Sequence, residues 1–170
     1  RLRQIDMFYG NRVRTYYSDS LLIEQEVCEA DVVIGAVLLP GATAPKLVTR
    51  DMVKKMKSGS VMVDVAIDQG GCFETSKATT HANPTFLIDG VLHYCVANMP
   101  GAVARTSTFA LTNATYPFIE ALANHGVQQA MVMDQHLRNG LSVHQGVLTS
   151  GPVAKAQNID YSPAEDMIMV

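Results

Sequence analysis

The stretch 59–75, GSVMVDVAIDQGGCFET, carries the residues whose types and spacing best suit chemistry. Its apolar side chains predict a buried strand over 60–67 that leads directly to the carboxylate of Asp68. Ligands of open α/β sheets bind beyond the carboxyl ends of the strands, and a carboxylate placed there can transfer protons. Gly70 and Gly71 follow, and glycine permits both unusual backbone angles and the close approach of a ligand. The stretch therefore predicts a binding site with an acid or base at Asp68.

Each of these residues also has a plain structural interpretation. Asp68 can cap a turn, the two glycines can serve backbone conformation alone, and Asp64, inside the strand, is interpreted as structural. Cys72 has no base beside it in the sequence, so a catalytic thiol is not expected. Asn98 follows a second apolar run, and an amide there needs hydrogen-bond partners, either on a ligand or in a turn.

The elements that must position these residues alternate between strand and helix. The pattern predicts a helix at 1–8, a strand at 13–17, a helix at 20–30, a strand at 32–37, a loop at 38–45, a helix capped by Thr49 that ends at Lys57, and the strand at 60–67. Strands that alternate with helices across short loops form parallel sheets with right-handed crossovers. The predicted fold class is α/β, with a Rossmann-like parallel sheet.

The rest of the chain predicts a different organisation. Residues 72–85 have the composition of an irregular loop, and 86–97 predict one or two further strands interrupted at Gly90. Beyond Asn98 the apolar spacing becomes helical, with helices predicted at 105–125 (kinked at Pro117), at 127–138 and at 151–157. We therefore expect a helical C-terminal segment after the sheet.

Composition limits the classes of function. Of 170 residues, 48% are hydrophobic and 17% charged, and the net charge is −3. This charged fraction is below the usual quarter, so we expect much of the surface to be covered by other protein. Nucleic acid is not an expected partner because no basic stripe is visible, and no apolar run reaches the roughly 18 residues that a membrane span needs. Cys28, Cys72 and Cys95 lack metal-site spacing and are expected to be free thiols.

The first residues suggest a chain that begins within a fold. The sequence starts at Arg1, and RLRQIDMFYGNRVRTYYS has the pattern of the end of a helix, a turn and a strand. We expect the C-terminal part of a longer protein. In this division, 1–98 is the second part of the sheet domain, and 99–170 packs on an N-terminal domain or on a neighbouring subunit.

Three segments together resemble the alanine dehydrogenases: VIGAVLLPGATAPKLV at 33–48, the stretch at 59–75, and HYCVANMPGAVARTSTFALTNAT at 93–115. The resemblance implies the C-terminal half of an NAD-binding Rossmann-like domain. It also implies a homohexameric, cytoplasmic enzyme that interconverts L-alanine with pyruvate and ammonia, using NAD. The glycine fingerprint G-x-G-x-x-G is not in this sequence, and we expect it upstream.

The resemblance also implies roles for particular residues. Arg1 would lie near the adenosine ribose, Ser18 near the adenine, and Val37 and Leu38 on the adenine side. The nicotinamide half would be lined by Val65, Ala66, Ile67 and Asp68, with Val96, Ala97, Asn98 and Met99 as its second wall. Lys77 stands where the family usually has arginine, which keeps the charge but loses the planar fork.

Catalysis is expected to be shared with residues outside this sequence. The family's substrate-binding arginine and lysine and its catalytic histidine belong to the N-terminal domain, and none of the five histidines here matches that position. Asp68 is expected to orient the amine and the attacking water, and no metal is expected.

Two other functions remain open from the sequence. One is the soluble NAD-binding part of a proton-translocating nicotinamide nucleotide transhydrogenase, which has a related fold and exchanges hydride between two nucleotides. The other is a non-catalytic dinucleotide-binding module, since a fold alone does not fix a function. The motif IDQGGCFET fits the dehydrogenase better.

Overall fold

The computed structural model describes residues 1–168, which form two compact units. The first unit comprises residues 1–37 and 45–96, and the second comprises 38–44 together with the chain from 97 onward.

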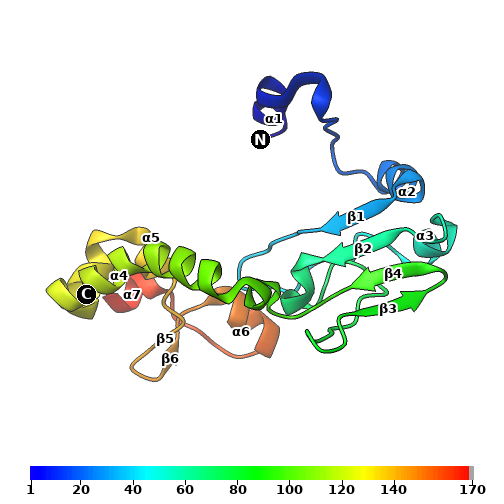
Figure 1. Cartoon of the computed structure of the whole chain (residues 1–170). Coiled ribbons are helices and arrows are strands. Elements are labelled where there is room, and N and C mark those ends of the chain that lie inside the picture. The colour runs from blue at the N-terminus through cyan, green and yellow to red at the C-terminus, as the bar shows by residue number, and fades with distance from the viewer. Residues whose placement is uncertain (169–170) are drawn as a thin grey trace. The chain divides into compact units, whose positions relative to one another are not determined.

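A four-stranded sheet forms the centre of the first unit (Figure 1). Its order is β1 (Val32–Gly35), β2 (Val61–Asp64), β4 (Val91–Tyr94) and β3 (Thr85–Ile88). The first three strands run parallel, and β3 pairs with β4 as an antiparallel hairpin at the edge. The α/β class and the Rossmann-like parallel arrangement are confirmed, and the hairpin makes the sheet mixed.

The two faces of this sheet differ in burial. Met62, Val91 and His93 are fully buried on one face, and Val53 and Phe73 complete the same core. Side chains of alternate residues point to the other face, which is more open. Ile34 and Leu87 there are 65% and 68% exposed.

Local capping explains the helices of the first unit. They are α1 (Leu2–Tyr9), η1 (Gly10–Arg12), α2 (Ser20–Glu29) and α3 (Arg50–Lys55). Asp19 caps α2 by accepting the backbone N–H groups of Leu21 and Leu22, and Thr49 caps α3 by accepting that of Met52. The predicted Thr49 cap and the predicted helices are therefore present, with α3 ending two residues earlier than expected, and the Asp19 cap was not predicted.

Two predicted strands were wrong in extent or existence. Residues 13–17 are extended but form no strand within the part of the chain that the structure describes, because a strand requires a neighbour for its ladder of hydrogen bonds. The strand expected at 60–67 ends at Asp64. The Asp64 carboxylate accepts the backbone N–H of Ala66 and turns the chain into the 3-10 helix η2 (Val65–Gln69).

The second unit is mostly helical. Its elements are η3 (Met99–Val103), α4 (Ala104–Met133), α5 (Gln135–Asn139), the hairpin strands β5 (Val143–His144) and β6 (Val147–Leu148), α6 (Gly151–Gln157) and α7 (Ala164–Ile168). In the described range 1–168, no helix is long and apolar enough to span a membrane.

The breaks in these helices agree only in part with those predicted. Non-helical backbone angles divide α4 at Gly126 (φ 74°, ψ 168°), between the helices predicted at 105–125 and 127–138, whereas the backbone at Pro117 stays helical and does not divide the helix. The helix expected at 127–138 is divided at Asp134, whose carboxylate accepts the backbone N–H groups of His136 and Leu137 and so starts α5.

Candidate active site at the ends of the parallel strands

Asp64, the last residue of β2, is the centre of the loop that follows the strand. Its side chain is fully buried. Oδ1 accepts the N–H of Ala66 at 3.1 Å, and Oδ2 accepts the N–H of Cys72 at 2.9 Å and the hydroxyl of Ser76. Buried polar groups require such partners. One carboxylate therefore fixes both ends of the segment 65–76.

Asp68 lies on the exposed side of this segment. It belongs to η2 and not to a strand end, so the predicted direct passage from strand to Asp68 was wrong. Ala66 and Ile67 are buried beneath it, whereas Val65 is 49% exposed. Together Val65 and Asp68 give η2 one apolar and one anionic exposed side chain, which suits a flat ring and a polar substrate.

The two glycines after η2 have a conformational role. Gly70 and Gly71 have φ angles of 88° and 75°, in the left-handed region that residues with a Cβ avoid. A Cβ on Gly71 would lie 2.6 Å from Oδ2 of Asp64. This supports the conformational interpretation and leaves the close approach of a cofactor as a prediction.

Lys46 forms hydrogen bonds with the main chain of the turn at Gly70 and Gly71. Its ammonium donates to the carbonyl oxygens of Gly70 at 2.6 Å and Gly71 at 2.8 Å. Charged donors make hydrogen bonds roughly twice as strong as neutral ones. Lys46 was not among the predicted site residues.

A second buried pair fixes the loop near Lys77. Thr75 Oγ1 and His93 Nε2 are 2.8 Å apart, and His93 Nδ1 lies 3.0 Å from the carbonyl oxygen of Val91. Because a carbonyl only accepts, Nδ1 carries the proton and the threonine hydroxyl donates to Nε2. Burial lowers the pKa of His93, so the ring is held neutral. Lys77 is exposed, two residues beyond this anchor.

The thiols near the site are unreactive. Burial, followed by the nearby carboxylate of Asp64, raises the pKa of Cys72 to about 11, and burial also raises the pKa of Cys95. At neutral pH both are therefore protonated, and the thiolate is the nucleophilic form. This favours the structural interpretation of Cys72.

The sheet brings three of the predicted segments to one edge. Val37, the residues of η2 and Val96 follow β1, β2 and β4, which are adjacent parallel strands. Val37 is half-buried and Val96 fully buried. The arrangement therefore provides an apolar edge with one exposed carboxylate, where open α/β sheets bind ligands.

The other predicted residues belong to other parts of the chain. Leu38, Ala97, Asn98 and Met99 are in the second unit, where Leu38 is 71% exposed and Asn98 has the left-handed φ of 57°. A groove of about 610 Å³ beside Asn98 is lined by η3 and the first turns of α4. Exposed Arg1 precedes α1, and exposed Ser18 precedes the cap of α2. Within residues 1–168, no cluster of three side chains could hold a metal ion.

The sequence contained a signal for the central role of Asp64. Strand residues alternate between faces, so Asp64 shares the face of buried Met62 and must find donors there. Lys46 carried no comparable signal, because its carbonyl partners lie 24 and 25 residues away in the chain.

One known protein family matches most of this chain. The family described as "Alanine dehydrogenase/PNT, C-terminal domain" matches residues 1–151. The chain belongs to this family. The resemblance to alanine dehydrogenases is thereby confirmed.

Individual members of the alanine dehydrogenase/PNT family are closely similar to this chain. It is 60% identical to an alanine dehydrogenase of Halomonas elongata and 54% identical to one of Mycolicibacterium smegmatis, over 99% and 98% of its own length. It spans about 45% of the length of each of these relatives.

Solved structures of an alanine dehydrogenase and of a transhydrogenase are both similar to this chain. A structure titled L-alanine dehydrogenase superposes with a TM-score of 0.79 at 47% identity, over 92% of this chain and 43% of that one. A transhydrogenase from Sinorhizobium meliloti superposes with a TM-score of 0.62 at 26% identity, over 81% of this chain and 37% of that one. The dehydrogenase is thus the more similar in both sequence and fold.

Proposed function

We propose that this chain is the C-terminal part of an NAD-dependent L-alanine dehydrogenase. The observation that carries the proposal is the 60% identity with an alanine dehydrogenase over 99% of this chain. The reaction converts L-alanine, NAD⁺ and water to pyruvate, ammonium, NADH and a proton, and the reverse reaction aminates pyruvate. The greater similarity to the dehydrogenase than to the transhydrogenase favours this reaction over hydride exchange between nucleotides.

We propose that NAD binds at the carboxyl ends of the parallel strands. Val65, Ala66, Ile67 and Asp68 would line the nicotinamide half of the site, with Val96, Ala97, Asn98 and Met99 as its second wall. Val37 and Leu38 would contact the adenine side, Ser18 would lie near the adenine, and Arg1 would lie near the adenosine ribose. Lys77 would keep the positive charge of the arginine that the family usually has there. Exposed Val65 supports this proposal because it offers apolar surface to a flat ring.

Asp68 is the residue of this chain proposed to act on the substrate. When bound, NAD supplies the acceptor for the hydride that leaves the α-carbon of alanine. Asp68 is exposed on η2, and its carboxylate would accept hydrogen bonds from the substrate amine and from the attacking water. A histidine of the N-terminal domain would provide the main acid and base. The protein is further proposed to be a cytoplasmic homohexamer in which residues 99–170 pack on that domain or on a neighbouring subunit.

The test is an assay of the full-length protein for NADH formation with L-alanine. Asp68→Asn is expected to lower kcat at least about 100-fold, the usual contribution of a positioned acid or base. Asp31→Asn is the matched control, because that exposed aspartate precedes the other end of β1.

Each result has one meaning. Full activity of Asp68→Asn would retain the dehydrogenase and remove Asp68 from the mechanism. NADH binding by the unmodified protein without any alanine-dependent turnover would reject the proposed reaction and favour transhydrogenation or a binding module.

A further inference from the structure

The peptide group between Gly71 and Cys72 is held by opposite charges at its two ends. Its carbonyl oxygen accepts from the Lys46 ammonium at 2.8 Å, and its N–H donates to Oδ2 of Asp64 at 2.9 Å. Because the peptide is trans, the carbonyl and the N–H point in opposite directions. Lys46 and Asp64 therefore contact the group from opposite sides, each aligned with its dipole.

Further hydrogen bonds extend this attachment to the whole turn. Lys46 also donates to the Gly70 carbonyl, and Asp64 also accepts from Ala66. The Gly71 N–H donates to the Ala66 carbonyl at 3.0 Å and completes the link across η2. Two consecutive glycines would otherwise give the chain after Asp68 wide conformational freedom. The hydrogen bonds to Lys46 and Asp64 restrict this conformational freedom.

We propose that Asp64 and Lys46 are positioning residues that hold η2, and with it Val65 and Asp68, at the nicotinamide half of the NAD site. This inference rests on the proposed function. Asp64 is fully buried and so acts through the loop, not on a ligand. The Lys46 ammonium is bonded to two main-chain carbonyls and acts through the same loop.

The chemistry of the contacts selects the variants. The Asp64 carboxylate accepts hydrogen bonds from donors of Ala66, Cys72, Phe73 and Ser76. Asp64→Asn keeps the shape but turns one acceptor into an amide donor facing those donors. Lys46→Met keeps the length of the side chain and removes the charge, whereas Lys46→Arg keeps the charge.

The experiment compares two ligands on the full-length protein. NADH contains the nicotinamide, and ADP-ribose lacks it. Asp64→Asn and Lys46→Met are each expected to weaken NADH binding about tenfold, the equivalent of one lost charge-assisted hydrogen bond. ADP-ribose binding is expected to stay within about twofold of the unmodified protein, and Lys46→Arg to recover most of the NADH affinity. Lys54→Met is the control, since Lys54 pairs only locally with Asp51 on α3.

The outcomes separate this inference from the proposed function. Equal losses of affinity for NADH and ADP-ribose would show that Asp64 and Lys46 stabilise the structure in general. Unchanged NADH affinity would show that they do not position the site. Either result overturns the inference. If Asp64→Asn does not fold, Lys46→Met decides alone, because Lys46 is exposed. Failure of the unmodified protein to bind NADH would instead reject the proposed cofactor.

Discussion

The segment 65–76 and the helix α4 show two different ways in which a structure is stabilised. The segment has almost no regular secondary structure beyond one turn of 3-10 helix, yet buried Asp64 and Thr75 connect it to the sheet. In contrast, α4 is a 30-residue helix whose only buried residues are Ala130 and Met131. The irregular segment is therefore fixed by tertiary contacts within this chain, whereas most residues of the helix are not buried by the rest of this chain.

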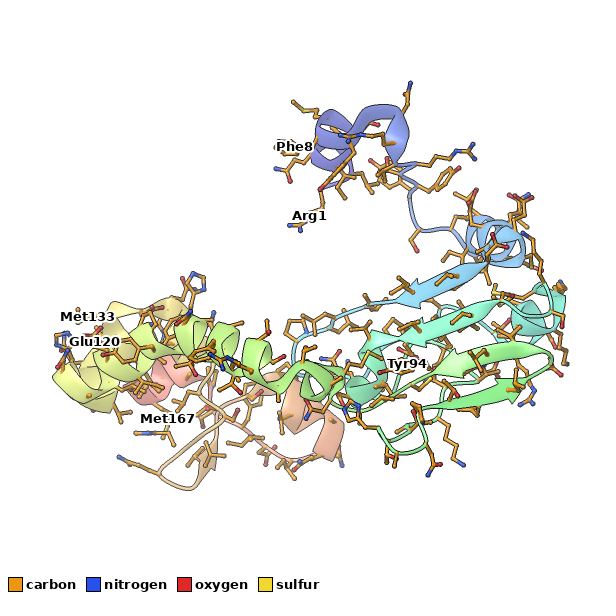
Figure 2. All side chains as sticks on the ribbon, in the orientation of Figure 1. Arg1, Phe8, Tyr94, Glu120, Met133 and Met167 are labelled. Atoms are coloured by element: carbon orange, nitrogen blue, oxygen red, sulfur yellow. The ribbon has the colours of Figure 1, made fainter. Side chains whose placement is uncertain are left out.

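The exposed side chains of α4 explain the low charge of the chain. Between Ala104 and Met133 the only charged residues are Arg105 and Glu120. Phe109, Leu111 and Ile119 are each 59–66% exposed, and Figure 2 shows Glu120 and Met133 among the side chains of this helix. Large apolar side chains exposed on several sides of one helix are typical of a surface that other protein covers. This supports the proposal that the helix is covered by other protein.

The largest expected difference between the segment 65–76 and α4 is the loss of stability when one glycine in each is replaced by alanine. Gly71 and Gly126 have similar φ angles, 75° and 74°, but only at Gly71 would a Cβ meet other atoms. Gly71→Ala is expected to lower the free energy of unfolding by about 3 kcal/mol, from backbone strain and loss of the Asp64 hydrogen bonds. Gly126→Ala is expected to cost about 1–2 kcal/mol, from backbone strain alone. Denaturant unfolding of both full-length variants measures the difference, and equal losses would contradict the comparison.

The pH dependence of stability provides a second, smaller contrast. Burial lowers the pKa of His93 below its ordinary value of 6.5. Below pH 6.5 His93 binds a proton in the unfolded chain but stays neutral in the folded chain. The contribution of neutral His93 to stability is therefore complete above pH 6.5 and decreases as the pH falls toward the folded pKa. The thermal midpoint of the full-length protein is expected to decrease in this window. His93→Gln, which cannot titrate, is expected to flatten that part of the profile, and an unchanged profile would assign the effect elsewhere.

A polar substitution on α4 is expected to have the smallest effect on stability but a clear effect on assembly. Ile119→Gln replaces a side chain that is 59% exposed, so the free energy of unfolding should change by about 0.5 kcal/mol or less. If α4 is covered by a neighbouring subunit, as proposed, light scattering should show a smaller native mass. Glu120→Gln, at the adjacent exposed position, is the control. A large loss of stability at unchanged mass would show that α4 is covered within its own chain.

Periodicity and capping residues determined most of the local structure of this protein. The cap at Thr49, the loop at 72–85 and the strands interrupted at Gly90 all follow from short-range preferences, which act within a few residues. The long motifs also determined the family, because they specify side chains one by one. These features required no knowledge of the fold.

Long-range contacts decided where the elements stop and which residues matter at the site. An eight-residue apolar pattern indicated a strand through Ile67, but the strand ends at Asp64, whose buried carboxylate accepts hydrogen bonds from Cys72 and Ser76 as well as from neighbouring Ala66. The sequence could not show that Lys46 lies on the carbonyls of Gly70 and Gly71, because only the folded sheet brings those residues together. Residues 13–17 have strand-like composition but pair with no strand within residues 1–168. A hydrogen-bond partner distant in the chain is a property of the tertiary structure, and local preference contains no information about it.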